Sequence, residues 1–264
     1  MRELLIRTLS GIIYVAVVIG SILYSKESLY IVFYLLMLLC LFEFKNLIKL
    51  SYKWTFVVAT LIYFRFSNLP ALDFKYFQFF LIISIFIPFI YQVLKPKISL
   101  TSSKLGHYLL ALAYIAIPFT LLTQIPFIED VYHPKILIGF FILIWVNDSF
   151  AYIVGSSIGK TKLYEIVSPN KTVEGAIGGF VAALIGAYFI SIYITSLSYL
   201  NWTIIAMITV IFGVLGDLME SKFKREAGVK DSSNFIPGHG GFLDRLDSII
   251  FAAPFVYVYL HLIY

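Results

Sequence analysis

Residues 140–155 read FFILIWVNDSFAYIVG, an apolar run with an acid, Asp148, near its centre. Such a run is typical of a membrane-spanning helix, which needs roughly 20 predominantly apolar residues to cross the hydrocarbon layer. An acid inside a span is expensive, so such residues usually face the interior of a helix bundle or a watery cavity. The stretch therefore predicts a membrane protein with a polar site among its helices.

The rest of the chain has the same character. Its 264 residues are 60% hydrophobic and 13% charged, which leaves too few polar side chains to cover a soluble domain. In a membrane protein, the net charge of +5 favours an anionic lipid surface or an anionic substrate over nucleic acid. The single cysteine, Cys40, lies in the apolar run LLMLLCLF and cannot form an internal disulfide.

Apolar runs separated by charged breaks predict an all-α fold, a polytopic transmembrane helical bundle of about nine spans. The first run has a basic start like a secretory signal, but it lacks a convincing small-residue cleavage site, so we expect a retained helix. We expect one integral membrane domain over 1–264, with N-terminal helices of unassigned role at 1–130 and the candidate site in 140–264. The predicted spans are 8–24, 29–44, 54–70, 76–94, 106–126, 136–157, 174–198, 202–219 and 246–264.

Lys and Arg are unevenly divided between the two sides that nine spans define. Sixteen fall in the N-terminal segment and the even-numbered connections, and four fall on the other side. Because cytoplasmic loops carry the excess of basic residues, the N-terminus is expected in the cytoplasm and the C-terminus outside. The connections at 160–173 and 221–245 would then share the cytoplasmic face.

Four acids lie within or beside the predicted spans. Asp148 lies in the sixth span and Asp217 ends the eighth, while Asp244 and Asp247 share one face where the ninth helix begins. Carboxylates at one depth repel one another unless a cation lies among them, and oxygen ligands suit Mg²⁺. The simpler alternative pairs each acid with a base, such as Asp244 with Arg245. Asp148 has no such neighbour in its own helix, so the set predicts a metal or phosphate site.

The stretch 221–247, SKFKREAGVKDSSNFIPGHGGFLDRLD, gathers charge in an otherwise apolar chain. Its basic side chains can neutralise phosphate oxygens, and its glycines let backbone N–H groups approach a ligand closely. A solvated patch that touches anionic lipid is the simpler reading, but such a patch needs no PGHGG motif. The candidate catalytic residues are Lys224, Arg225, Lys230, His239 and Arg245, with Gly240 and Gly241 as candidate substrate-binding residues.

A second polar segment, SPNKTVEG at 168–175, offers a turn, a cation and the start of a helix. Alone it is a weak signal for function, and it gains weight from its predicted place on the same face as 221–245. Its candidate substrate-binding residues are Ser168, Asn170, Lys171 and Thr172. The following glycines, in GAIGGFVAALIGA, are expected to permit close helix packing.

Together these motifs resemble the phosphatidate cytidylyltransferase (CDP-diglyceride synthase) family. The resemblance covers the chain from about residue 140 and is supported by SPNKTVEG and by Asn147 with Asp148. It implies a Mg²⁺-dependent reaction of CTP with phosphatidate at the inner membrane, which gives CDP-diacylglycerol and pyrophosphate in phospholipid synthesis. The motifs that carry it are SKFKR at 221–225, KD at 230–231, PGHGG at 237–241 and DRLD at 244–247.

The resemblance also implies roles for the candidate residues. Asp217 and Asp244 would be the principal metal ligands, with Asp247 and Asp148 as further ligands or supports for them. A second cation would be ordinary for this chemistry. Lys171 would contact the triphosphate or the phosphatidate, while His239 either donates to an oxyanion or braces the glycine turn; these two alternatives stay open. The small-residue helix face and the resemblance together suggest a homodimer.

Two other functions stay open at this point. A CTP-dependent polyprenol or phytol kinase, which resembles this family around its acidic and glycine-bearing loops, would pass on the γ-phosphate and release CDP. A non-enzymatic ion or lipid transporter would place an ion at the same carboxylates without turnover. The product formed from CTP separates the first alternative, and turnover itself separates the second.

Overall fold

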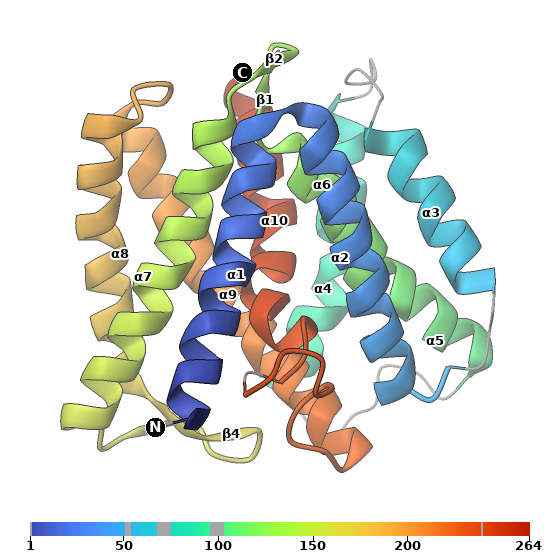
Figure 1. Ribbon diagram of the computed structural model, residues 1–264, viewed down its shortest axis with the longest axis vertical. Helices are drawn as coiled ribbons and strands as arrows, with labels where there is room; N and C mark the ends of the chain where they lie inside the picture. Colours follow the sequence, from blue (N-terminus) through green and yellow to red (C-terminus); the bar gives the residue numbers. More distant parts are fainter. Residues whose placement is uncertain (1, 51–53, 68–74, 96–102, 239) are drawn as a thin grey trace.

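The structure is a computed structural model that describes residues 2–50, 54–67, 75–95, 103–238 and 240–264. In these residues the chain forms a helical bundle with two short hairpins (Figure 1). The helices are α1 (Arg2–Tyr24), α2 (Lys26–Leu47), α3 (Trp54–Ser67), α4 (Lys75–Leu94), α5 (Lys104–Ala111), the π-helical turn η1 (Leu112–Ala116), α6 (Ile117–Gln124), α7 (Pro134–Ile158), α8 (Val173–Tyr193), α9 (Tyr199–Ala227) and α10 (Leu243–Ile263). The antiparallel hairpins pair β1 (Phe127–Ile128) with β2 (Val131–Tyr132) and β3 (Lys162–Tyr164) with β4 (Ser168–Thr172).

The predicted all-α polytopic bundle is confirmed. Helices α5 and α6 join through η1 into one segment, so each predicted span corresponds to one helical segment in the described residues. Seven of these segments are long and apolar enough to cross a membrane, while the described apolar parts of α3 and α4 are shorter. The count of nine spans is therefore approximate.

Helix α9 is longer than the sequence predicts. The eighth predicted span ends at 219, but α9 runs on to Ala227, so the first residues of the charged stretch are helical. Phe223 anchors this extension because its ring packs 4.9 Å from that of Phe44 and 5.3 Å from that of Tyr114. The helix ends at Gly228, whose left-handed backbone, with φ at 74°, suits glycine.

Helices α7 and α8 are held close together by glycines on α8. A Cβ atom on Gly175 would lie 2.6 Å from the carbonyl oxygen of Ala151, and one on Gly179 would lie 2.6 Å from Oδ1 of Asn147. Side chains at these positions would force the two helices apart. The prediction that the glycines serve close packing is confirmed for Gly175, Gly178 and Gly179, whereas a Cβ atom on Gly186 would make only ordinary contacts.

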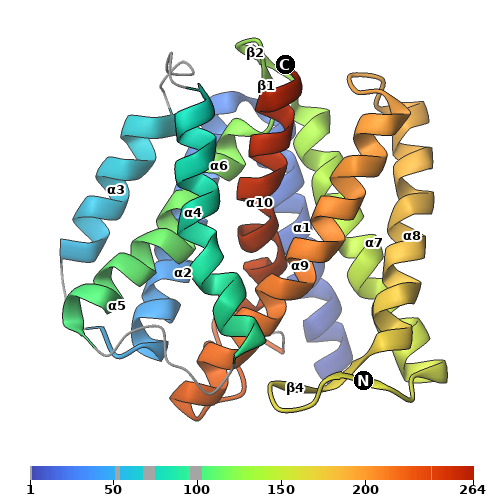
Figure 2. The same ribbon diagram turned by 180° about the vertical axis from the view of Figure 1, so that it is seen from behind.

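The two chain ends lie at opposite ends of the bundle (Figure 1). The N-terminus, the β3–β4 hairpin and the segment between α9 and α10 lie together at one end, as the view from behind also shows (Figure 2). We call this the N-terminal end of the bundle. The two polar stretches that the sequence placed on one face therefore share one end of the molecule.

Candidate functional site

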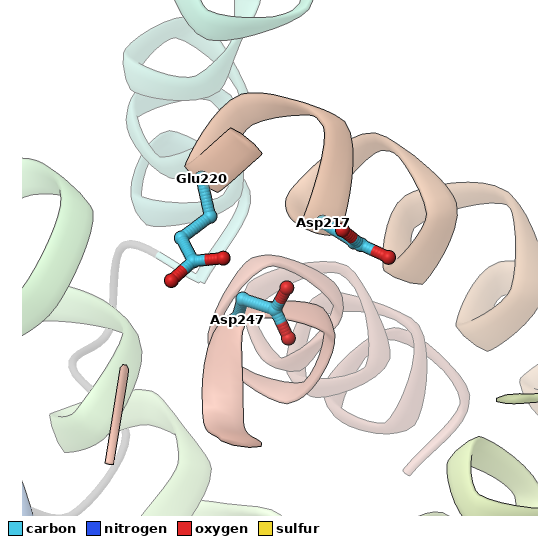
Figure 3. A group of neighbouring side chains, drawn as sticks. All are labelled: Asp217, Glu220 and Asp247. Carbon is cyan, nitrogen blue, oxygen red and sulfur yellow. The ribbon is translucent and has the colours of Figure 1, made fainter. Parts of the chain in front are cut away.

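Three carboxylates meet where α9 packs against α10. Oxygen atoms of Asp217, Glu220 and Asp247 all lie within 4.8 Å of one another. Asp217 and Glu220 are three residues apart and therefore share one face of α9, while Asp247 faces them from α10 (Figure 3). Asp217 is half-buried, whereas Glu220 and Asp247 are only 1% and 8% exposed. This group of acids is the candidate metal site.

Two lysines partly compensate the negative charge. Lys171, on β4, forms an ion pair with Asp217. Lys224 lies 2.5 Å from Oε2 of Glu220 and 2.7 Å from Oδ1 of Asp244. The other oxygen of Glu220, Oε1, is buried and has no hydrogen-bond partner among the described residues. An unpaired carboxylate oxygen in a buried site is costly, and a cation bound between the three acids would satisfy it.

Asp148 belongs to the same electrostatic neighbourhood. Its Oδ1 accepts a 3.1 Å hydrogen bond from the side-chain amide of Asn147. The charged groups that act on Asp148 are Lys171, Asp217 and Arg245, and those that act on Asp247 include Asp148 itself. Helices α7, α9 and α10 and strand β4 thus converge on one charged region.

Asp244 has a different environment from the other predicted ligands. Its Oδ1 accepts a hydrogen bond from Lys224. Its Oδ2 accepts three more: from the backbone N–H of Ser232 at 2.9 Å, from the Ser232 hydroxyl at 2.9 Å and from the backbone N–H of Gly241 at 2.8 Å. Asp244 therefore fastens the segment between α9 and α10 to the start of α10. Gly240, whose φ is 81°, leaves room for the Asp244 carboxylate.

The β3–β4 hairpin presents Lys171 to the site. Thr172 accepts the N–H of Gly175 at 3.1 Å and so caps α8. Glu174 accepts the backbone N–H groups of Lys160 and Thr161, each at 3.1 Å, which ties the start of the hairpin to α8. The hairpin is thus fixed at both ends.

The remaining predicted residues lie on β4, outside the described residues, or at the exposed surface. Ser168 is half-buried and Asn170 exposed, both on β4. His239 lies outside the described residues. Of the basic residues predicted to be catalytic, Arg225, Lys230 and Arg245 are exposed and so are accessible to a soluble anion.

Sequence reasoning missed two acids. Glu220 lies one helical turn after Asp217, and its spacing alone could have marked it as a third ligand. Glu43 interrupts the apolar run of α2 and is fully buried. Like Asp148, Glu43 is an acid within an apolar span, and this feature alone could have marked it.

Comparison with known proteins supports the resemblance noted in the sequence. Residues 5–263 match the model of the cytidylyltransferase family. A protein of Bacillus subtilis named phosphatidate cytidylyltransferase is 34% identical over 97% of both chains, and one of the same name from Staphylococcus haemolyticus is 35% identical over 97% of this chain and 98% of its own. A third, from Haemophilus influenzae, is 49% identical over 48% of this chain and 46% of its own. The chain belongs to the cytidylyltransferase family.

Proposed function

We propose that this protein transfers the cytidylyl group of CTP to phosphatidate and so forms CDP-diacylglycerol and pyrophosphate. The relatives that match nearly the whole chain bear the name of this activity. The observation that carries the proposal is the group of Asp217, Glu220 and Asp247, with Lys171 paired to it, beside two polar segments at one end of a membrane bundle. A reaction between a soluble triphosphate and a lipid phosphate needs a charged site of this kind at the edge of the bilayer.

The three carboxylates suit Mg²⁺. The donors are all oxygens, which this cation prefers, and Oε1 of Glu220 is buried with no partner among the described residues. Asp217, Glu220 and Asp247 would hold the ion, with Asp148 close by. When bound, Mg²⁺ supplies positive charge that stabilises the reacting phosphates. A second cation and the ligand role expected for Asp244 stay predictions.

The protein's own residues would position and neutralise the substrates. A phosphatidate oxygen attacks the α-phosphorus of CTP while the bond from that phosphorus to the pyrophosphate oxygen breaks. The attacking phosphate is already ionised near neutral pH, so positioning and charge neutralisation carry the catalysis. Half-buried Lys171 would contact the reacting phosphates, and the exposed Arg225, Lys230 and Arg245 would hold the phosphate oxygens at the entrance.

The excess of Lys and Arg in the connections on one side of the spans indicates which side of the membrane carries the site. We place the protein in the inner membrane with its N-terminus and its site on the cytoplasmic side, where CTP is available. The glycine face of α8, which suggested a homodimer, packs against α7 within the chain. A homodimer therefore stays a prediction that this face does not support.

Purified protein, given Mg²⁺, phosphatidate and CTP labelled in the base, tests the proposal. Pyrophosphate and a labelled CDP-lipid are the expected products, and neither should form without Mg²⁺ or without lipid. Release of CDP would instead indicate a kinase, and no turnover would favour a transporter. Asp217→Asn is expected to abolish turnover in protein that still inserts and purifies. Asp130→Asn, in the exposed turn at the opposite end of the bundle, should leave turnover intact.

A further inference from the structure

Glu43 is a buried acid in the N-terminal half of the chain, to which the proposed reaction assigns no role. Its side chain is 0% exposed near the end of α2. Within the described residues, no basic side chain lies within ion-pair distance of it. Burying a charge is expensive unless it is paired or fully hydrogen-bonded. Neutral donors must therefore compensate Glu43.

Four such donors are present, and all come from about 190 to 200 residues further along the chain. Oε1 accepts from the hydroxyl of Ser233 at 2.6 Å and the N–H of Phe242 at 3.0 Å. Oε2 accepts from the hydroxyl of Ser232 at 2.8 Å and the N–H of Leu243 at 2.8 Å. Two of these donors are backbone groups at the start of α10, where a helix has unpaired N–H groups and favours a negative charge.

The segment between α9 and α10 is shaped around this carboxylate. A Cβ atom on Gly241 would lie 2.4 Å from Oε2 of Glu43, so only glycine lets the backbone pass this close. The ring of Phe235 also packs 6.0 Å from that of Phe42, the neighbour of Glu43 on α2. Figure 1 shows this segment against the lower ends of α1 and α2. Helix α2 is thus the surface on which the segment rests.

A chain of polar contacts connects Glu43 to the candidate metal site. The hydroxyl of Ser232 lies within hydrogen-bond distance of both Glu43 and Asp244, and its one proton serves one carboxylate at a time. Asp244 pairs with Lys224, and Lys224 pairs with Glu220. Glu220 is one of the three grouped acids. A displacement at Glu43 would therefore be passed to the position of Lys224.

We propose that Glu43 is a positioning residue that fixes residues 231–238 and 240–243 on α2 and, through Ser232 and Asp244, sets the place of Lys224 beside Glu220. This role rests on the proposed function, because it concerns the geometry of that same site. Helix α2, in the N-terminal half of the chain, would then support the segment that carries Ser232 and leads to Asp244 beside the candidate metal site.

The test compares Glu43→Gln with Glu43→Asp. Each oxygen of Glu43 accepts one backbone N–H, so a glutamine amide leaves one of those N–H groups without an acceptor in either orientation. We expect Glu43→Gln to lower kcat at least about tenfold at temperatures where the variant is still fully folded, and Glu43→Asp, which keeps both oxygens, to recover part of the loss. Glu27→Gln, at the exposed start of the same helix, is the matched control and should keep full kcat.

A wild-type kcat in Glu43→Gln would overturn the proposal. So would a loss that follows a lower melting temperature and is not recovered by Glu43→Asp. If Glu43→Gln does not fold, Ser232→Ala and Ser233→Ala test the proposal instead. Both hydroxyls donate to Glu43, but of the two only Ser232 also contacts Asp244. Ser232→Ala is expected to lower kcat more than Ser233→Ala, and equal or reversed effects would count against the chain of contacts.

Amide hydrogen exchange separates this proposal from the proposed function. Faster exchange at 231–243 in Glu43→Gln is the expected result, whatever the substrates are, and unchanged exchange there would overturn the positioning role. If wild-type protein fails to turn over CTP and phosphatidate, the proposed function is wrong. The difference in amide exchange between the wild type and Glu43→Gln still tests the contact between Glu43 and this segment.

Discussion

Two buried acids, Glu43 and Asp247, show how differently a carboxylate can be accommodated in this protein. Glu43 accepts four hydrogen bonds and needs nothing further. Asp247 is 8% exposed, accepts the N–H of Ser248 at 2.7 Å and faces two other acids. Lys171 and Lys224 pair with those other acids rather than with Asp247. The charge of the first acid is therefore compensated within the protein, whereas the second lies among acids that a bound cation would compensate further.

Mg²⁺ should stabilise the protein through Asp247. We expect the melting temperature of the wild type to rise with Mg²⁺, by an amount equivalent to about 2.7 kcal/mol at a concentration about 100 times the Kd. Asp247→Asn removes one of three mutually repelling charges, so it should melt higher than the wild type without Mg²⁺ and gain less when Mg²⁺ is added. Thermal melting in detergent at several Mg²⁺ concentrations measures both effects.

The control for this prediction is Asp130→Asn. Asp130 has a φ of 63°, a conformation that Asn tolerates, and lies in the turn between β1 and β2 at the other end of the bundle. It should keep the full Mg²⁺ response. An Asp247→Asn variant that responds to Mg²⁺ as the wild type does would remove Asp247 from the metal site.

At the scale of elements, the close pair of α7 and α8 positions one side of the site. The pair carries Asn147 and Asp148 on α7, and α8 begins directly after β4 with Lys171. Gly179 contacts Asn147 so closely that a Cβ atom would lie 2.6 Å from its Oδ1 and 2.7 Å from its carbonyl oxygen. The distance between these helices therefore controls where Asp148 lies relative to Lys171.

Gly179→Ala is expected to separate the two helices. Overpacking of this kind costs about 1–3 kcal/mol, and because it shifts Asp148, turnover should fall together with the melting temperature. Gly186→Ala is the matched control on the same helix, since its Cβ would make only ordinary contacts at 3.7 Å or more. We expect that control to change stability by no more than about 0.5 kcal/mol. Equal effects of the two substitutions would contradict this account of the packing.

At the scale of the whole molecule, the bundle separates a polar end from an opposite end that carries the β1–β2 turn. The N-terminus, the β3–β4 hairpin and the segment before α10 share the first end (Figures 1 and 2). Most of the Lys and Arg lie in connections assigned to this side. The bias of basic residues toward the cytoplasm therefore predicts a single orientation for the entire bundle.

Single-cysteine labelling in intact cells tests this orientation. The native Cys40 is fully buried and should not react with a membrane-impermeant maleimide. Cysteines placed at the exposed positions Asn170 and Lys230 should be protected until the cells are broken, whereas one at Glu129, in the β1–β2 turn, should react from outside. The reverse pattern would place the site on the external face. Protection at only one of Asn170 and Lys230 would contradict the placement of the β3–β4 hairpin and the segment before α10 on the same side of the membrane.

Much of the fold and part of the site could be predicted from local sequence. Runs of apolar residues gave the spans, because the hydrocarbon layer requires length and apolarity whatever the tertiary contacts are. The grouping of Asp217 with Asp247 followed from their places at the ends of two spans on one side. Helix α9 beyond 219 could not be predicted in the same way, since Phe223 is held there by rings from α2 and η1.

By itself, the sequence determined that this is a polytopic membrane protein of the cytidylyltransferase family with its acids and basic motifs at one end of the bundle. Only the tertiary structure decided which acids meet. It brought Glu220 to Asp247, turned Asp244 toward Lys224, and placed Glu43 against the start of α10. The physical reason is that hydropathy is a property of neighbours in the chain, whereas the partner of a buried carboxylate is fixed by helix packing between residues as distant as Glu43 and Leu243.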